Sequence, residues 1–384
     1  MTIYRFIKPL DVLFLRGNHL FGDTGQHGQA LLPPWPSVAA GALRSRMLAD
    51  ADVDFDAFKT KEPAGALGTA LGTPAKPGSF RLVGLWLSRN LNGQVQRYHP
   101  VPSDVLKLEG KLHRLRPRAL PLLSSANLPQ VPVLQSDKTT KAESGWLLNE
   151  LGWQAWLHDE PLDAERHTEH TSTLYALDER LGIALDTNSR TAADGALYTT
   201  QAVAMQPDSG FVCAVRGVDD ALVPASGLLR LGGDGRAAAI SKISSPESIS
   251  ANGSGEPAKL AMGGDRFKLI LTTPGIFDNG WRLPGLQPDN TWHGPARGCT
   301  ARLVCAAVSR AETVSGWDLA RWVPKPAQRV APTGSVYWFE NFRGDPAALG
   351  ELAESGLWGL PGQHDDAQRR AEGFNNVAIG DWTS

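Results

Sequence analysis

Cysteine is scarce in this sequence. The chain has 384 residues and only three cysteines, Cys213, Cys299 and Cys305. An odd number without C-x-x-C spacing indicates neither a disulfide framework nor a zinc knuckle. A reducing compartment fits this cysteine usage best.

Long apolar runs are also missing. The first residues, MTIYRFIKPLDVLFL, lack an apolar stretch followed by a small-residue cleavage site. No apolar run approaches the roughly 20 residues that a membrane-spanning helix needs. We therefore expect a cytoplasmic protein without a sorting signal and without a membrane partner.

A surplus of positive charge is absent as well. The chain has 38 Lys and Arg against 40 Asp and Glu, which gives a net charge of -2 and a pI near 6.5. Nucleic-acid-binding domains commonly carry a basic excess. Any site for a polyanion must therefore be local or shared with a partner.

Familiar catalytic motifs do not occur either. The sequence has no GxxxxGK[ST], HExxH or GxSxG, and no pair of carboxylates stands out as a general acid and base. The best metal candidate is the segment 158–170, in which His158, His167 and His170 lie near Glu165 and Glu169. A solvated polar loop is the interpretation that we favour there, and we expect no cofactor and no metal.

The elements that are present predict an α+β protein with two domains. Strand patterns over residues 3–16 and 79–89 frame a glycine-rich loop and a helix from Val38 to Leu48, with Ser37 as its N-cap. The helix carries an apolar stripe of Ala39, Ala40, Leu43 and Met47. The polar stretch 62–78 is expected to be a loop insertion.

Further elements follow from hydrophobic periodicity. Residues 143–157 predict an amphipathic helix, and 195–205 and 210–218 predict two paired strands. The segment 258–384 predicts three more strands and a helix that begins with Asp345 as cap and Pro346 at its first position. The Ser-, Gly- and Pro-rich segment 244–257 is the expected linker between domains at 1–245 and 258–384.

The segment LPPWPSVAAGALRSRML (32–48) allows two interpretations. Gly41 and Ser45 lie opposite the apolar stripe, which suits tight packing of the helix on a sheet. Alternatively, the helix N-terminus binds an anion and Arg44 reaches a neighbouring phosphate. The sequence leaves both open.

Two glycine-rich or basic segments are equally ambiguous. In LGGDGR (231–236), Gly233 or Gly235 supplies the positive φ of a hairpin turn, or the bare backbone admits a sugar-phosphate chain beside Arg236. The segment KLHRLRPR (111–118) is a solvated basic loop or an electrostatic guide for a polyanion. Twelve tryptophans exceed the usual number, and an exposed one can stack a nucleobase.

Seven segments in order carry a family resemblance. They are DVLFLRGNHLF, LLPPWPSVAAGALRSRML, LGIALDTNSRTAADGALYTTQ, LGGDGRAA, LTTPGIFDNGW, GWDLARWVPKPAQRVAPTGSVYWFE and GFNNVAIGDW. They lie within a match that runs from about residue 8 to 382, and they resemble the subunit-three family of the type III-B CRISPR (Cmr) effector complex, in the RAMP superfamily. The last segment departs from the family pattern at Asn375, where the family tends to carry glycine.

The resemblance implies a fold and a role in antiviral defence. The fold would be two ferredoxin-like (RRM-like) domains with long loop insertions. The protein would be a non-catalytic ribonucleoprotein subunit that holds the 5′ repeat-derived tag of the guide RNA and docks the large Palm-domain subunit. It would also contact the backbone RAMP subunit and, indirectly, target RNA. The residues on family motifs whose chemistry suits RNA are Arg16, His19, Ser37, Arg44, Arg190, Tyr198, Gly233, Gly235, Arg236, Lys325 and Arg329.

Two other functions compete with this one. A metal-independent ribonuclease that processes CRISPR repeat RNA would need a histidine near the glycine-rich loop, and His19 and His27 are the nearest candidates. A carbohydrate or small-ligand binder would use tryptophans and loops, and its affinity would not depend on salt.

Overall fold

The chain forms two units, each built from segments that are separate in the sequence. The computed structural model describes residues 1–15, 17, 27–121, 124–135, 140–186, 189–244, 264–295, 298–318 and 320–383. Unit 1 comprises residues 1–95, 171–244 and 313–328, and unit 2 comprises 96–170, 245–312 and 329–384. The division at 244–257 predicted from the sequence stays a prediction, because residues 245–257 lie outside the described part. The units differ from the predicted domains in two ranges. Residues 96–170 belong to unit 2 although they precede residue 245, and residues 313–328 belong to unit 1 although they follow residue 258.

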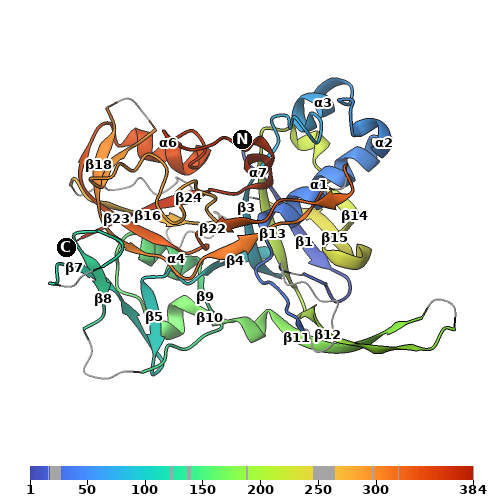
Figure 1. Cartoon of the computed structure of the whole chain (residues 1–384), viewed down its shortest axis with the longest axis horizontal. Coiled ribbons are helices and arrows are strands. Elements are labelled where there is room, and N and C mark those ends of the chain that lie inside the picture. Colours follow the sequence, from blue (N-terminus) through green and yellow to red (C-terminus); the bar gives the residue numbers. More distant parts are fainter. Residues whose placement is uncertain are drawn as a thin grey trace. The chain divides into compact units, whose positions relative to one another are not determined.

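Unit 1 is built on an antiparallel sheet in the order β3-β13-β1-β15-β14 (Figure 1). Its strands are β1 (Ile3–Pro9), β3 (Arg81–Leu91), β13 (Ser209–Arg216), β14 (Ser226–Arg230) and β15 (Ala237–Lys242). A ribbon of β11 (Tyr175–Leu185) and β12 (Ala192–Met205), with the short parallel strand β2 (His27–Gly28), forms a second sheet. Strands β20 (Trp317–Asp318) and β21 (Val323–Pro324) form a small hairpin.

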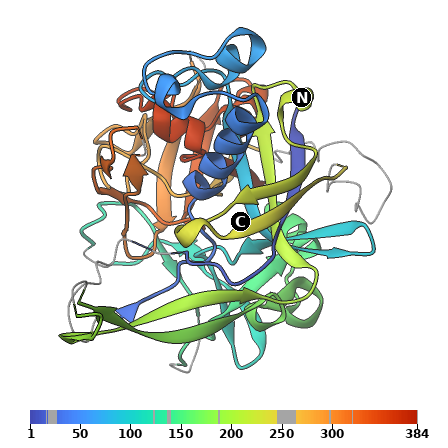
Figure 2. The ribbon, with the colours of Figure 1, turned by 90° about the vertical axis from the view of Figure 1, so that its right-hand side faces the viewer.

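Helix α1 (Pro36–Asp50) lies on one face of the unit 1 sheet, against β3 and β14 (Figure 2). The predicted stripe of Ala39, Ala40, Leu43 and Met47 is buried, so this part of the prediction is confirmed. Helices α2 (Phe55–Phe58) and α3 (Gly65–Leu71) follow. The stretch 62–78 is thus not a plain loop, because Leu67, Ala70 and Leu71 on α3 enter the core.

Unit 2 is built on an antiparallel sheet in the order β17-β18-β23-β16-β24. Its strands are β16 (Phe267–Leu271), β17 (Thr291–His293), β18 (Thr300–Ala307), β23 (Val336–Arg343) and β24 (Val377–Asp381). Helices α6 (Ala347–Ser355) and α7 (Ala367–Glu372) lie between β23 and β24 in the chain. Asp345 accepts a hydrogen bond from the N–H of Ala347, but the N-cap of α6 is Pro346 and the helix begins at Ala347, so the predicted start lies one residue too early.

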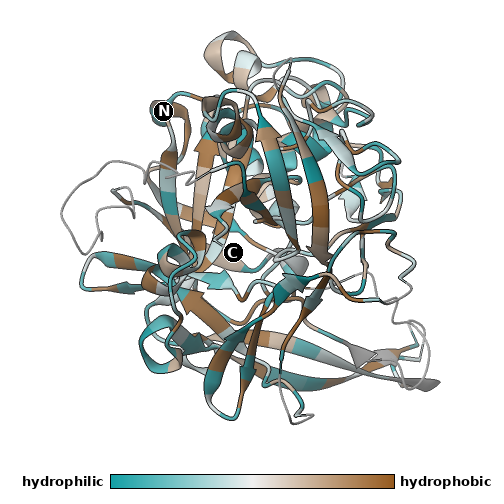
Figure 3. Cartoon of the chain, turned by 90° about the vertical axis from the view of Figure 1, so that its left-hand side faces the viewer, coloured by the Kyte–Doolittle hydropathy of each residue, from teal (hydrophilic) through white to brown (hydrophobic). Residues whose placement is uncertain are grey.

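The first half of the chain supplies the rest of unit 2. It contributes β4 (Gln94–Pro100), β5 (Val105–Leu108), β6 (Lys111–Arg114), β7 (Arg116–Arg118), β8 (Val131–Val133), β9 (Trp146–Asn149), α4 (Glu150–Leu157), α5 (Ala164–His167) and β10 (Thr168–His170). The short strands β19 (Glu312–Val314) and β22 (Gln328–Val330) lie at the borders of the two units. Figure 3 shows apolar residues along the strands and polar ones along many of the turns.

Both faces of the unit 2 sheet are covered by apolar side chains. Leu349 and Leu352 of α6 belong to one core cluster, together with Phe267 and Phe339 of the sheet. On the other face, Trp153 and Trp156 of α4 pack with Ile270, Val304 and Trp338 in a second cluster. Because a residue of a strand points to the face opposite its neighbour's, β16 feeds both clusters.

Two sequence predictions about these elements are wrong. Residues 143–157 do not form one helix, because Trp146–Asn149 are a strand paired with β4 and β10, and α4 begins only at Glu150. Residues 195–205 and 210–218 both contain strands, but β12 pairs with β11 whereas β13 pairs with β1 and β3. In both places, pairing with distant strands decides the local structure. The α+β class itself is confirmed by mixed helices and antiparallel sheets.

Candidate functional site

The glycine turn between β14 and β15 is the hairpin that the sequence predicts. It is a short 3-10 turn over Gly233–Gly235, in which Gly232, Asp234 and Gly235 have positive φ. At Gly235, φ is 62° and a side chain would meet nothing closer than Arg230 Cδ at 3.9 Å. Positive φ at Gly235 confirms one of the two glycines proposed for that role. The backbone there is bare and open.

This turn packs on residues 13–15 of the N-terminal strand segment. The N–H of Gly233 donates to the carbonyl of Phe14 at 2.8 Å. The Arg236 guanidinium lies 5.1 Å from the centre of the Phe14 ring, and Arg180 of β11 lies 6.0 Å from it. Both are cation–π distances. Two guanidinium groups thus approach one aromatic ring beside a glycine turn.

The β11–β12 ribbon also contacts residues 13–15. Leu13 and Val203 of β12 exchange backbone hydrogen bonds of 2.9 and 2.8 Å. We call this arrangement of residues 13–15, residues 232–236 and Arg180 the Phe14 junction. The charge of Arg236 is balanced by Asp11, whose carboxylate lies 2.6 Å from Nη1. A phosphate bound by Arg236 would compete with that exposed carboxylate.

Sequence reasoning found only part of this junction. Gly233, Gly235 and Arg236 were predicted and lie together, whereas Phe14, Asp11 and Arg180 were not singled out. The motif DVLF was the available signal, since it contains Asp11 and Phe14. Arg16 and His19, which follow directly, lie outside the described residues, and so does the side chain of His27.

Ser37 does not cap α1, so that prediction is wrong. The N-cap is Trp35, and no side-chain hydrogen bond caps the helix. Pro36 occupies the first helical position, where its fixed φ and missing N–H are best tolerated, and this places Ser37 inside the first turn. Trp35 is buried, and its Nε1 has no hydrogen-bond partner among the described residues.

The packing interpretation of Gly41 is also wrong. Gly41 is exposed, and a side chain built there would meet no atom within 4 Å. Arg44 is half-buried on the same helix. Arg46 connects α1 to the sheet by donating to the carbonyl of Leu228 in β14, and it also pairs with Asp50 of the same helix at 2.6 Å.

The remaining predicted residues are dispersed. Arg190 is exposed before β12, and its N–H donates to the carbonyl of Asp186 at 2.9 Å. Tyr198 is half-buried on β12, with its ring over Gly182 of β11. Lys325 follows β21 in unit 1, whereas Arg329 is exposed in β22 and belongs to unit 2. The roles of these residues stay predictions.

The basic segment 111–118 is not a solvated loop. Arg114 and Arg116 both donate to the carboxylate of Asp159, at 2.7 and 2.9 Å, and Lys268 Nζ lies 3.4 Å from it. Burial would raise the Asp159 pKa, but Lys268, together with hydrogen bonds from Thr383 and Arg116, lowers it to about 2. Burial also lowers the pKa of Lys268, to about 8. These cations hold unit 2 together.

The histidines of segment 158–170 are dispersed among separate contacts. His158 Nδ1 lies 3.2 Å from Asp381, and the buried His167 accepts from the N–H of Asp163 at 3.1 Å. His170 stands edge-on to Trp146. Within the described ranges, no three His, Cys, Asp or Glu side chains are grouped so as to hold a metal ion. The predicted solvated loop is therefore only partly right, because residues 164–170 form a short helix and a strand whereas 158–163 are turn and coil.

The conformation of Asn375 shows why asparagine can stand where the family tends to carry glycine. Its φ is 64°, a left-handed value that glycine adopts freely and that asparagine tolerates best among the other residues. The fully buried side chain accepts from the N–H of Ile276 at 2.6 Å and donates to the carbonyl of Ile276 at 3.2 Å. Asparagine therefore keeps the backbone shape and adds a clamp within the core.

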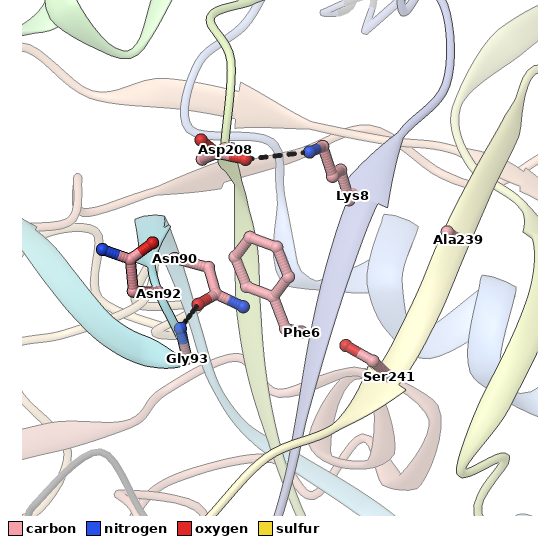
Figure 4. Close-up of a pocket in the computed structure, with 8 residues that line it drawn as sticks. All are labelled: Phe6, Lys8, Asn90, Asn92, Gly93, Asp208, Ala239 and Ser241. Carbon is pink, nitrogen blue, oxygen red and sulfur yellow. Dashed lines mark hydrogen bonds and ion pairs between the residues drawn. The ribbon is translucent and has the colours of Figure 1, made fainter.

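A cavity of about 420 Å³ opens on the unit 1 sheet, and its lining does not include the residues of the glycine turn. Figure 4 shows the Phe6 ring between Asn90 and Ser241, with Lys8 paired to Asp208 at the rim. The Lys8–Asp208 distance is 3.1 Å. Because these charges cancel, the cavity has hydrogen-bonding amides but no uncompensated cation for a phosphate.

Comparison with known proteins decides the family. The sequence model of the family described as CRISPR-associated protein (Cas_Cmr3) matches residues 5–382. The chain belongs to this family. The Cas_Cmr3 match covers nearly the whole chain and confirms the resemblance drawn from the seven segments. A comparison with curated protein sequences gives no match.

Solved structures of type III-B Cmr-beta assemblies resemble this Cas_Cmr3 chain distantly. One, bound to cognate target RNA, is 14% identical with a TM-score of 0.48 and covers 97% of this chain and 96% of its own. Another, bound to cognate target RNA and AMPPnP, is 15% identical with a TM-score of 0.46 and covers 87% and 86%. In the part of the chain that the structure describes, no helix is long and apolar enough to span a membrane.

Proposed function

We propose that this protein is a non-catalytic RNA-binding scaffold subunit of a type III-B Cmr complex. In this role it holds the 5′ repeat-derived tag of the guide RNA and docks the large Palm-domain subunit beside the backbone RAMP subunit. Target RNA is then met only indirectly. The observation that carries the proposal is the Phe14 junction, in a chain that belongs to the Cas_Cmr3 family.

The chemistry of the junction suits single-stranded RNA of fixed sequence. Unpaired bases are recognised by stacking on aromatic or guanidinium planes and by hydrogen bonds to their edges. Arg180 and Arg236 provide such planes beside the buried ring of Phe14, and the turn at Gly235 lets a sugar-phosphate backbone approach without a side chain in the way. A few local cations are sufficient for this, which agrees with the net charge of -2.

The strand orders support two ferredoxin-like domains. In this fold, a β-α-β-β-α-β chain forms a sheet in which the first and third strands are central. Strands β3-β13-β1-β15 of unit 1 and β18-β23-β16-β24 of unit 2 have that order. Helix α1 takes the first helical position in unit 1, and α6 takes the second in unit 2.

Binding of a guide RNA with its 5′ tag tests the proposal. We expect Arg236→Glu and Arg44→Ala to weaken binding while the protein stays folded, which urea unfolding checks. If Arg236 neutralises one phosphate, the slope of log K against log salt becomes shallower by about 0.7 in its variant. Arg310→Glu, an exposed arginine of unit 2, makes the same charge change as a control. Unchanged tag binding in both variants would contradict the site.

The partners and the absence of catalysis are tested separately. Purification from the protein's own cells should yield guide RNAs that share one 5′ end, together with the large Palm-domain subunit. Incubation with repeat RNA in a chelator should leave the RNA intact. Clean cleavage that is lost in His19→Ala would establish the ribonuclease instead. If the purified protein carries no RNA and its affinity for a ligand does not depend on salt concentration, the result would favour a carbohydrate or small-ligand binder.

A further inference from the structure

Two tryptophans lie exposed on the β20–β21 hairpin of unit 1. Trp317 is 48% and Trp322 is 72% exposed, and their rings stand edge to face with centres 5.9 Å apart. Tryptophan is largely buried in most proteins, because its ring carries the largest apolar surface of any side chain. A pair of exposed rings therefore suggests a binding surface.

The backbone presents Trp322 in an unfavourable conformation. Its φ is 58°, in the left-handed region that a bulky residue rarely adopts and that costs about 1–3 kcal/mol. The hairpin is held by Asp318, which accepts from the N–H groups of Ala320 and Arg321 at 3.0 and 3.1 Å. The N–H of Lys325 donates to Gly316 at 2.8 Å. The hairpin thus holds the Trp322 ring toward solvent, and the strained backbone lowers the free energy of unfolding.

The charges around the pair favour a polyanion over a protein surface. Arg321, next to Trp322, is 73% exposed, and the Lys325 stem lies along Gly316, next to Trp317. Asp318, which lies 4.0 Å from Arg321, is only 15% exposed and faces its own turn. Cations therefore lie in sequence beside both rings, in a chain whose net charge is negative.

We propose that this hairpin stacks an unpaired base of single-stranded RNA on Trp322, with Trp317 supporting the ring and Arg321 contacting the adjoining phosphate. The inference rests on the proposed function, since it assumes that the protein binds RNA. It adds a second contact, separate in sequence from the Phe14 junction, that is tolerant of sequence because every base has a π-face.

Trp322→Gly is the decisive variant. Glycine adopts positive φ freely, so the variant removes the ring and relieves the backbone together. We expect its urea-unfolding midpoint to stay equal or rise, while its Kd for a fluorescein-labelled single-stranded RNA 12-mer rises about 5- to 100-fold. Trp317→Ala should weaken binding less. Phe55→Ala, an exposed aromatic of α2 that is 50% exposed, is the matched control and should bind as the wild type does.

A second probe separates stacking from charge. A 12-mer of abasic ribose units keeps the phosphates but has no bases, so wild type and Trp322→Gly should bind it equally. Equal binding of the base-containing 12-mer by both proteins would overturn the inference and leave the proposed function standing, with the hairpin then a protein contact. A wild type that binds neither probe, and carries no guide RNA, would overturn both.

Discussion

Replacing Asp159 by asparagine removes the charge at the centre of unit 2 while keeping the side chain's shape. The carboxylate is 2% exposed and faces Lys268, which is 1% exposed, and Arg114, which is 10% exposed. It also accepts from Arg116 at 2.9 Å and from the Thr383 hydroxyl at 2.6 Å. Breaking a buried ion pair from one side costs about 3–5 kcal/mol, because the remaining charge stays buried without a partner.

The lower end of that range applies here. Arg116 is 40% exposed and can turn to water, and Arg114 still donates to the carbonyls of Ala155 and Glu160. Asp104 compensates less, because burial raises its pKa and favours its neutral form. We therefore expect Asp159→Asn to lower the free energy of unfolding by about 3 kcal/mol, a large part of the 5–15 kcal/mol typical of whole domains.

Urea unfolding of the full chain measures this loss, with two variants as controls. Asp56→Asn removes an exposed ion pair of 2.6 Å with Lys59 and should leave the unfolding midpoint nearly unchanged, because water screens both charges. Adding Lys268→Met to Asp159→Asn should recover part of the loss, because the unpaired cation is gone. A loss below about 1 kcal/mol in Asp159→Asn, or no recovery in the double variant, would refute the argument from unpaired charge.

Three further predictions concern stability. Gly41→Ala should raise the free energy of unfolding by about 0.5–1 kcal/mol, since the site is helical, exposed and open, and a loss on urea unfolding would contradict this. Asn375→Ala should cost about 2–4 kcal/mol in the same assay, because it removes the Ile276 clamp and strains the backbone, and Asn375→Gly should cost less. Unfolding midpoints should fall as pH drops below 6.5, because burial lowers the pKa of His99 in the folded protein. They should fall further between pH 4.5 and 2, because the unfolded chain binds a proton on Glu150 near pH 4.5 whereas the folded protein does so only near pH 2, and a flat profile would contradict both assignments.

The acid dependence has a local origin in unit 2. Burial would raise the pKa of Glu150, but the hydrogen bond with His99 and the charges of His99 and Arg97 lower it to about 2. A lowered carboxylate pKa gives stability above the unfolded value of 4.5 that is lost as pH falls toward 2. Burial lowers the pKa of His99, whose ring stacks on Trp153 at 4.4 Å, so this histidine becomes charged only at a pH below its ordinary range. Glu150→Gln should remove the lower part of the pH profile and enlarge the fall below pH 6.5, because the Glu150 carboxylate raises the pKa of His99.

Local patterns in the sequence predicted much of the fold. The stripe on α1, the strands at 81–91 and 267–271, and the glycine turn are set by periodicity and by residues with special φ values, which a short window contains. Strand pairing was not predictable in this way. Residues 146–149 have helical spacing of apolar residues, yet pairing with β4 and β10 makes them a strand. The sequence carries no local record of those partners.

The candidate site was predicted to a similar extent. Glycines and arginines of the turn were found because their chemistry is visible in LGGDGR, whereas Phe14 and Arg180 meet the turn only in the folded unit. The cations of 111–118 were predicted to face solvent or RNA, because their partner Asp159 lies 43 or more residues away from Arg114 and Arg116. Charge in a segment indicates function only once its partners are known.

The interleaving of the units has a consequence for synthesis of the chain. The tryptophans of α4 emerge from the ribosome early, but their core also needs β16, β18, β23 and Trp382. The apolar face of α4 therefore stays partly exposed to solvent until almost the whole chain has been synthesised. A polypeptide truncated near residue 245 would keep this surface exposed and is expected to aggregate or to recruit chaperones.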